Sequence, residues 1–195
     1  MSAAAGRLVA VTDQTSVRTD RLHLTAPVPA DLPELHALHA DPRGYVHWPW
    51  GRHTTVEQTE RLLDRYRESW DEHGLGPWVV RAATDGRLVG MGGCSVRGGV
   101  GWNLYYRLVP EEWGHGYAQE VVAAARTAAR ATRPDLPVLA YLLEHNTGSL
   151  RAVERAGLTR VWRGPDAGNP DPSAIRLVYA DREVDEATVA VFAGP

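Results

Sequence analysis

The chain has 195 residues, a formal net charge of −3 and a hydrophobic content of 44%. This length and composition fit one soluble globular domain that buries a sizeable core. The slight negative charge disfavours nucleic acid as the main partner, because binding to phosphates needs a basic surface.

The sequence also bears on the compartment of the protein. Neither the apolar stretch of a signal peptide nor a membrane-length apolar run occurs in it, so we expect no membrane contact. Its single cysteine, Cys94, has no partner for an intramolecular disulfide, which is typical of the reducing cytoplasm. Because Cys94 lies in an apolar run, we interpret it as a small buried hydrophobic residue. We therefore expect a cytoplasmic protein.

The first elements are a strand and a helix that follow a small-residue leader. We expect residues 1–18 to be mobile, residues 21–25 to form a strand, and residues 31–41 to form a helix with an apolar face. His36 and His39 share this helix at i, i+3. No carboxylate or cysteine completes a metal-ligand pattern with them, so we expect partly exposed histidines and no metal site.

The segment Tyr45 to His53 concentrates aromatic and histidine side chains and follows neither helical nor strand periodicity. Two interpretations of Trp48 and Trp50 stay open at this stage. The two indoles either clamp the loop onto the core or form the wall of a pocket for a substrate. A second amphipathic helix follows at 54–74.

The remaining elements alternate between strands and helices. In chain order we expect strands at 78–83, 87–96 and 102–109, a helix at 117–130, a strand at 138–143, a helix at 146–156, and strands at 158–162 and 175–179. Asp85-Gly86 between two apolar runs is typical of a hairpin turn, and a strand, helix, strand order implies parallel pairing. This order predicts one mixed sheet with helices on both faces. Residues 181–195 are expected to be a polar tail.

A glycine-punctuated turn, Gly114-His115-Gly116, joins the strand at 102–109 to the alanine-rich helix. Glycine has no side chain, so backbone N–H groups approach a ligand closely, and the positive helix N-terminus attracts anions. This arrangement is typical of a pyrophosphate cradle. The same kind of turn also commonly joins a strand to a helix without binding any ligand, so the motif alone leaves both interpretations open.

A second motif decides between them. Asn146-Thr147-Gly148-Ser149 opens a helix that ends at Ala156-Gly157. Together, PEEWGHGYAQE and HNTGSLRAVERAGL resemble the acetyl-CoA-binding motifs of the GNAT N-acetyltransferase superfamily, especially its ribosomal-protein-alanine acetyltransferase-like branch. The resemblance extends over about residues 19–180, which we expect to form the acetyltransferase domain.

The resemblance implies the mixed α/β GNAT fold. This fold has one central, mostly antiparallel mixed sheet of about seven strands, with helices on both faces and with strands four and five splayed apart. The acetyl-pantetheine arm of the cofactor acetyl-CoA enters the splay and pairs with the backbone of strand four. The residues that would hold acetyl-CoA are Leu108, Val109, Trp113, Gly114, His115, Gly116, Tyr117, Ala118, Asn146 and Ser149. Glu111 departs from the family, which often has Gln or Arg there.

Acetyl transfer needs a stabilised oxyanion and a donor for the departing thiolate. A backbone N–H near Leu108 or Val109 would stabilise the oxyanion, because Pro110 has no N–H. Some family members place a tyrosine seven residues after the motif asparagine, where this chain has Val153. Ser149 matches the serine that the alanine-acetyltransferase-like branch places close to the cofactor sulfur. Capping of its helix is the alternative role for Ser149.

The acceptor amine must also lose a proton. A glutamate that the family often uses on strand four aligns with Asn103, the second catalytic candidate, although an amide is no base at neutral pH. Deprotonation would instead run through water or His47, with His53 as a further candidate. We predict that His47, Trp48, Trp50 and His53 line the acceptor side.

The sequence therefore predicts an acetyl-CoA-dependent N-acetyltransferase that transfers an acetyl group directly to a primary amine, either a protein N-terminus or a small molecule. The alternative is an acyl-CoA-binding regulatory module with weak or no transfer. A phosphotransfer protein is disfavoured because a lysine-free chain has no G-x-x-x-x-G-K-[ST] motif. We expect acetyl-CoA and an amine as partners, no nucleic acid, no membrane and no metal, and either a monomer or a homodimer.

Overall fold

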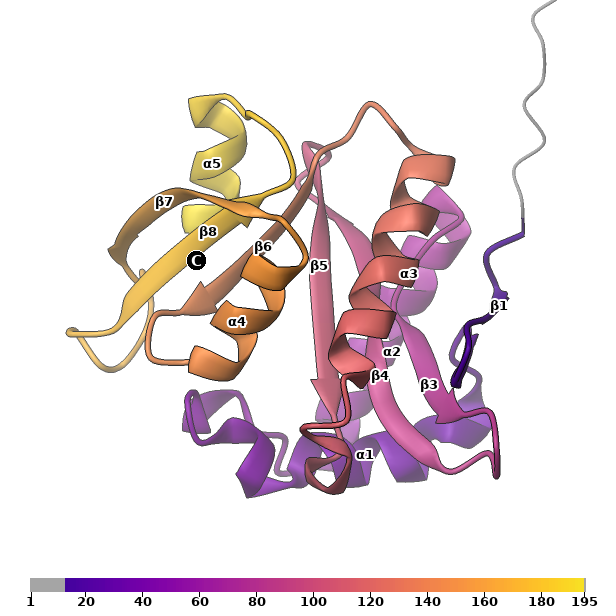
Figure 1. Ribbon diagram of the computed structural model, residues 1–195. Coiled ribbons are helices and arrows are strands. Elements are labelled where there is room, and N and C mark those ends of the chain that lie inside the picture. Colours follow the sequence, from indigo (N-terminus) through magenta and orange to yellow (C-terminus); the bar gives the residue numbers. More distant parts are fainter. Residues whose placement is uncertain (1–12, 195) are drawn as a thin grey trace, which may run out of the picture.

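The computed structural model describes residues 13–194 of the chain. It contains one sheet whose strands lie in the order β1, β2, β3, β4, β5, β6, β8, β7 (Figure 1). The strands are β1 (Ser16–Arg18), β2 (Leu22–Thr25), β3 (Trp78–Ala82), β4 (Leu88–Arg97), β5 (Gly101–Leu108), β6 (Val138–Leu143), β7 (Thr159–Pro165) and β8 (Ile175–Ala180). Among the strands of residues 13–194, only β5 and β6 pair in parallel, which confirms the predicted mixed, mostly antiparallel sheet.

The expected splay between strands four and five is the splay between β5 and β6. These strands pair only through Trp102 with Val138 and Asn103 with Leu139, and they then diverge (Figure 1). The backbone N–H of Trp102 donates toward β6, to the oxygen of Pro137. Because N–H groups alternate along a strand, those of the even-numbered residues beyond Asn103 face the open splay.

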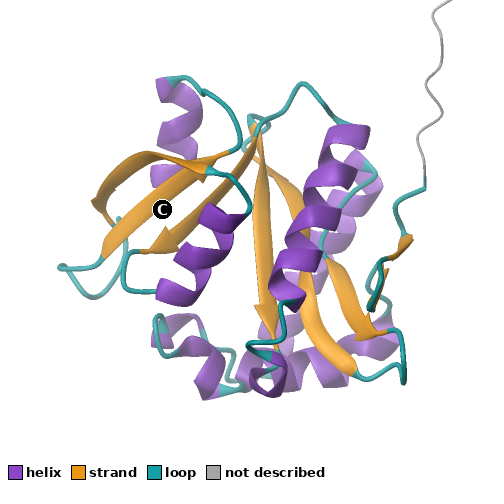
Figure 2. Ribbon diagram, viewed as in Figure 1, coloured by secondary structure: helices purple, strands orange, loops and turns teal. Residues whose placement is uncertain are grey.

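The helices lie on both faces of the sheet (Figure 2). They are α1 (Leu32–Ala40), α2 (Val56–His73), α3 (Tyr117–Thr132), α4 (Thr147–Arg155) and α5 (Glu186–Ala193). Helices α3 and α4 pack on one face through the main apolar cluster. On the opposite face, α1 and α2 cover β3 to β5, and α5 covers β6 and β8.

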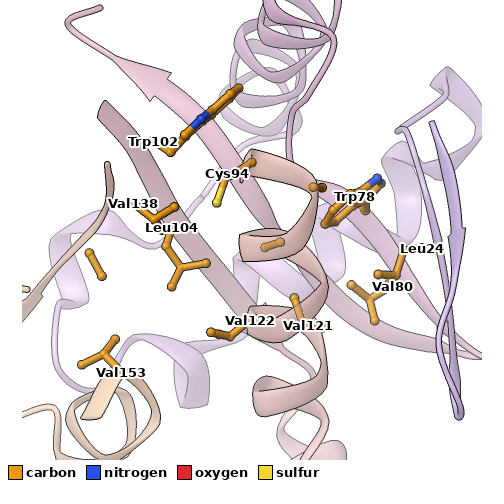
Figure 3. Close-up of a cluster of buried hydrophobic side chains, with 14 of the residues drawn as sticks. Leu24, Trp78, Val80, Cys94, Trp102, Leu104, Val121, Val122, Val138 and Val153 are labelled. Atoms are coloured by element: carbon orange, nitrogen blue, oxygen red, sulfur yellow. The ribbon is translucent and has the colours of Figure 1, made fainter. Parts of the chain in front are cut away.

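The main core lies between α3 and the sheet (Figure 3). Val121, Val122, Ala125 and Ala128 of α3 share one buried cluster with Trp102 and Leu104 of β5. Apolar positions three to four residues apart, such as 121, 125 and 128, lie on one face of the helix. Cys94 of β4 is buried among these side chains, and this burial raises the pKa of its thiol. Cys94 is therefore the small buried hydrophobic residue that the sequence predicts.

The expected leader and tail both contain regular structure. Residues 1–12 lie outside the described residues, but Ser16–Arg18 form β1 at the edge of the sheet. The expected polar tail is wrong as well, because residues 186–193 form α5. Its N-cap Asp185 accepts a hydrogen bond of 2.7 Å from the backbone N–H of Thr188. Phe192, the only phenylalanine of the chain, is fully buried against Leu139 and Val178.

Phe192 tests whether α5 is an integral part of the domain. Phe192→Ala should lower the free energy of unfolding by about 3 to 5 kcal/mol, because it leaves a cavity beneath the helix. Val189→Ala, at a half-buried position of α5, should cost less than about 1 kcal/mol. Urea denaturation of both variants measures the difference. Equal, small losses would show that α5 does not stabilise the fold.

Candidate active site

A cavity of about 680 Å³ lies where the end of β5 faces the N-termini of α3 and α4. Most of the residues that the sequence assigns to acetyl-CoA line it: Leu108, Trp113, Gly114, Gly116, Tyr117, Ala118, Asn146 and Ser149. Val109 and His115 are not among its lining residues. We call this space the first cavity.

The glycine turn at its floor has the geometry that the sequence suggests. Gly114 and Gly116 have φ values of +81° and +82°, in the left-handed region that favours glycine. A Cβ at Gly114 would meet no protein atom within 4 Å, so the backbone there faces open space. Arg21 supports the turn by donating 2.9 Å to the oxygen of His115 and pairing at 2.7 Å with Glu120 of α3. The turn is therefore open at Gly114 and is held from outside by Arg21, the residue before β2.

The backbone N–H groups at the end of β5 point in different directions. The N–H of Val109 donates to the oxygen of Val89 at 2.9 Å, so it is used within the sheet. By alternation, the N–H of Leu108 faces the open splay. The oxygen of Leu108 accepts a hydrogen bond of 3.0 Å from the indole of Trp113. Of the two oxyanion donors that the sequence offers, only Leu108 is directed toward the first cavity.

The second motif forms the start of α4. Asn146 is its N-cap, and the side-chain oxygen accepts a 3.1 Å hydrogen bond from the backbone N–H of Ser149. The backbone oxygen of Ser149 accepts a hydrogen bond of 3.4 Å from the hydroxyl of Tyr106. Burial raises the pKa of Tyr106, and a side-chain hydrogen bond with Ser149 acts against this rise. Asn146 thus performs the capping, and the Ser149 hydroxyl lies beside that of Tyr106.

A second cavity of about 470 Å³ opens on the opposite face of the sheet. Its walls come from β5, β6, the segment 42–51 and the loop after β7. The two cavities share the lining residues Gly44, His47, Tyr106, Arg107, Asn146 and Ser149. They therefore meet within the splay, and Ser149 stands at their junction.

Asn103 lies in the second cavity. Its side-chain oxygen is buried and has no hydrogen-bond partner among the described residues. A buried, unpaired amide oxygen costs free energy, so such a group is commonly completed by a ligand or a water molecule. Asn103 is placed to accept a hydrogen bond from a bound molecule.

The aromatic loop divides between the cavity and the surface. His47 and Trp48 line the second cavity, whereas Trp50 and His53 line neither cavity. Trp50 is 66% exposed, so it does not clamp the loop onto the core. Desolvation, followed by the nearby His145, lowers the pKa of His47, whose ring centroid lies 5.3 Å from that of His145.

His39 departs from expectation because it is only 1% exposed. It stacks on His53 at 4.7 Å and shares a 2.9 Å hydrogen bond with the hydroxyl of Tyr45. The ring of Tyr45 in turn lies 3.7 Å from the guanidinium carbon of Arg107. Burial, then Arg107 and the neighbouring histidines, lowers the pKa of His39 to about 3. His39 is thus a neutral, internal support for the loop.

Several residues of the second cavity escaped the sequence analysis. They are Arg97, Arg107, Tyr141, Asp166 and Arg176. Each sits in a strand or loop without a recognisable motif, and only the folded sheet brings them together. Strand alternation was the one available signal, because Asn103, Tyr105 and Arg107 occupy one face of β5.

Comparison with known proteins agrees with this geometry. Residues 21–159 match the family model of the acetyltransferase (GNAT) domain. The chain belongs to the GNAT acetyltransferase family. The predicted family and the predicted fold are therefore confirmed.

Solved structures with the same fold include enzymes for different acceptors. An acetyltransferase from Agrobacterium tumefaciens is 26% identical, with a TM-score of 0.69 over 86% of this chain and 94% of that one. Ribosomal-protein-S5-alanine acetyltransferase from Vibrio fischeri is 13% identical, with a TM-score of 0.71 over 88% and 97%. Spermidine N-acetyltransferase from Vibrio cholerae, in complex with CoA and spermine, is 16% identical, with a TM-score of 0.66 over 83% and 95%.

Within residues 13–194, no helix combines the length and the apolar character that a membrane span requires. The same residues contain no group of three or more metal-ligating side chains.

Buried His39 should make the stability of this GNAT protein depend on pH. Its folded pKa of about 3 lies below the usual histidine pKa of 6.5, so the unfolded chain binds the extra proton between these values. The stabilisation is complete above pH 6.5 and is lost as the pH falls toward 3. The free energy of unfolding should therefore drop by up to about 1.4 kcal/mol per pH unit over this range.

Denaturant unfolding at pH 7.5, 6 and 4.5 measures this slope. His39→Gln should remove most of this slope, whereas His36→Gln, at a partly exposed position of α1, should leave it in place. An unchanged slope in His39→Gln would assign the acid sensitivity to other groups.

Proposed function

We propose that this protein is an acetyl-CoA-dependent N-acetyltransferase that passes the acetyl group directly to a primary amine in a ternary complex. The observation that carries the proposal is the junction of two cavities in the β5–β6 splay, with Ser149 and Tyr106 lining both. Cofactor and acceptor would enter from opposite faces and meet there. No covalent enzyme intermediate is then needed.

The first cavity fits acetyl-CoA. The open backbone at Gly114, together with Gly116 at the N-terminus of α3, would hold the pyrophosphate. The free edge of β5 beyond Asn103 would pair with the pantetheine arm. Arg151 and Arg155 line the same cavity and add positive charge suited to phosphates, whereas Arg43, also in its lining, is paired with Asp41 and Glu111.

The chemistry follows from the junction. A neutral amine attacks the thioester carbonyl, and the N–H of Leu108 stabilises the oxyanion that forms. When this intermediate collapses, the C–S bond breaks and the Ser149 hydroxyl donates to the departing thiolate. The proton of the amine leaves through water or His47, which lines both cavities and whose lowered pKa keeps its imidazole neutral near pH 7.

Asn103 plays a different part from the glutamate that relatives often carry. Its amide cannot take a proton, but its unpaired oxygen can accept a hydrogen bond from the acceptor. The rival function, a CoA-binding module without transfer, would leave that oxygen unused. Thiol release from acetyl-CoA in the presence of an amine panel separates the two functions. Free, buried Cys94 further supports a reducing compartment such as the cytoplasm.

The glycine turn offers a matched pair of variants for cofactor binding. Gly114→Ala places a methyl group in the proposed pyrophosphate cradle and should weaken CoA binding by about tenfold or more. Gly86→Ala is the control, because Gly86 has a similar φ of +75°, also has open space around its Cβ, and lies in the remote β3–β4 turn. Both variants should lose about 1 to 2 kcal/mol of stability from the left-handed backbone. Calorimetry with CoA that finds equal affinities would reject the cradle.

Ser149 offers a test of the thiolate donor. Ser149→Ala should lower kcat by about tenfold to a hundredfold, or about 1.4 to 2.7 kcal/mol, with little effect on CoA affinity. Asn146→Ala is the comparison for capping and should lower stability by about 1 kcal/mol. Steady-state kinetics and thermal melting of both proteins separate the roles. A Ser149→Ala enzyme with nearly full kcat would contradict the donor assignment.

A further inference from the structure

The phenol of Tyr106 stands where the two cavities meet. Tyr106 is one of the six residues that line both cavities, and of these six only Tyr106 and Ser149 carry a hydroxyl. The Tyr106 hydroxyl donates to the backbone oxygen of Ser149 at 3.4 Å and also lies beside the Ser149 hydroxyl. Two hydroxyl groups, one from β5 and one from α4, therefore come together at the junction.

The position of the Tyr106 ring is fixed by the sheet. Tyr106 pairs with Gly92 of β4 and packs against the main apolar cluster. A Cβ at Gly92 would lie 3.0 Å from the Cβ of Tyr106 and 2.7 Å from a methyl carbon of Val121, so the glycine leaves this space to its neighbours. This packing directs the phenol toward α4, where its hydroxyl meets Ser149.

The hydrogen bond that the phenol makes to Ser149 is weak. An O–H···O bond is usually about 2.7 to 2.8 Å long, so a bond of 3.4 Å is easily exchanged for a shorter one to a charged acceptor. Burial raises the pKa of Tyr106, so the phenol keeps its proton at neutral pH. Tyr106 therefore offers a protonated donor to a negative charge that develops at the junction.

We propose that Tyr106 is a catalytic residue whose hydroxyl, together with that of Ser149, donates a hydrogen bond to the sulfur of CoA as the thioester breaks. The inference rests on the proposed acetyl transfer. When the tetrahedral intermediate collapses, the C–S bond breaks and its electron pair passes to the sulfur. The two hydroxyls stabilise this charge and keep their own protons. The sulfur then takes the proton that the amine nitrogen has lost, delivered through water or His47, so CoA leaves as a thiol.

The thiol of CoA itself provides a test that needs no acceptor. If the two hydroxyls stabilise a thiolate, the thiol pKa of bound CoA lies below the usual value of about 8.5, and the affinity for CoA rises with pH up to that value. Desulfo-CoA, which has a hydrogen in place of the thiol, lacks this rise. Calorimetry from about pH 6.5 to about pH 9 should show CoA gaining about tenfold or more over desulfo-CoA in the wild-type protein.

Tyr106→Phe should reduce this gain about threefold or more, because one of the two donors is lost. Tyr179→Phe is the matched control. The hydroxyl of Tyr179 also bonds α4, at 3.1 Å to Glu154, but Tyr179 lines neither cavity, so its variant should keep the full gain. An equal loss in both variants would assign the Tyr106 hydroxyl to the support of α4. No gain in the wild-type protein, or an unchanged gain in Tyr106→Phe, would also overturn the proposal.

Transfer rates test the same hydroxyl during the reaction. Single-turnover transfer from acetyl-CoA to spermidine or to a peptide with an N-terminal alanine should slow about tenfold or more in Tyr106→Phe, with little change in the KM of the amine. Replacement of Tyr106 by 3-fluorotyrosine keeps the hydroxyl but lowers its pKa. It should restore the rate at neutral pH, and the rate should fall again as the fluorinated phenol ionises at a lower pH than the phenol of tyrosine.

The failure of this inference differs from the failure of the proposed function. If acetyl transfer proceeds and Tyr106→Phe reacts at the wild-type rate, transfer stands and the Tyr106 assignment is wrong. If the wild-type protein acetylates neither amine, transfer is wrong, and the comparison of CoA with desulfo-CoA alone decides whether Tyr106 donates to the sulfur. A gain that is reduced in Tyr106→Phe and kept in Tyr179→Phe would support that contact, and any other result would overturn it.

Discussion

The parallel pairing of β5 and β6 ends after Asn103 and Leu139, and the candidate site depends on this early end. A continued ladder would satisfy the backbone of β5 and close the sheet between its two faces. Because the strands diverge, backbone N–H groups stay available to a ligand, and the cavities on the two faces meet. The sheet holds the arms of the splay rigidly, since β4 pairs with β5 and β8 pairs with β6.

Each arm is also fixed from the helical layers. On the β5 side, buried His39 holds Tyr45, and Arg107 lies on the Tyr45 ring, so the aromatic loop is tied to the strand. On the β6 side, the carbonyls at the end of α5 hold Arg176 below Tyr141. The walls of the second cavity are thus built by segments distant in sequence from the glycine turn and from Asn146. In the proposed function, variation in these segments can change the acceptor while the glycine turn stays the same.

Local sequence rules predicted what local chemistry determines. The glycine turn requires left-handed φ values, and Asn146 caps α4 through a bond three residues away, so both motifs could be recognised from a few neighbouring residues. Helix α5 was missed because a helix of 8 residues with mixed polarity has little pattern, and its stability comes from burying Phe192. His39 was misplaced because its burial depends on packing between α1, α2 and the loop, which periodicity does not describe.

The second cavity was the least predictable part for a related reason. Arg97, Tyr141 and Arg176 come from β4, β6 and β8, and no spacing along the chain joins them. Because the sequence contains no lysine, arginine occupies many surface positions as well. The few arginines that face a cavity therefore do not stand out in the sequence. Burial separates them, because Arg176 is only 8% exposed and meets a carboxylate, backbone carbonyls and a ring at once. A guanidinium held so firmly fixes the wall of the second cavity, because its side chain has lost its conformational freedom in the folded protein.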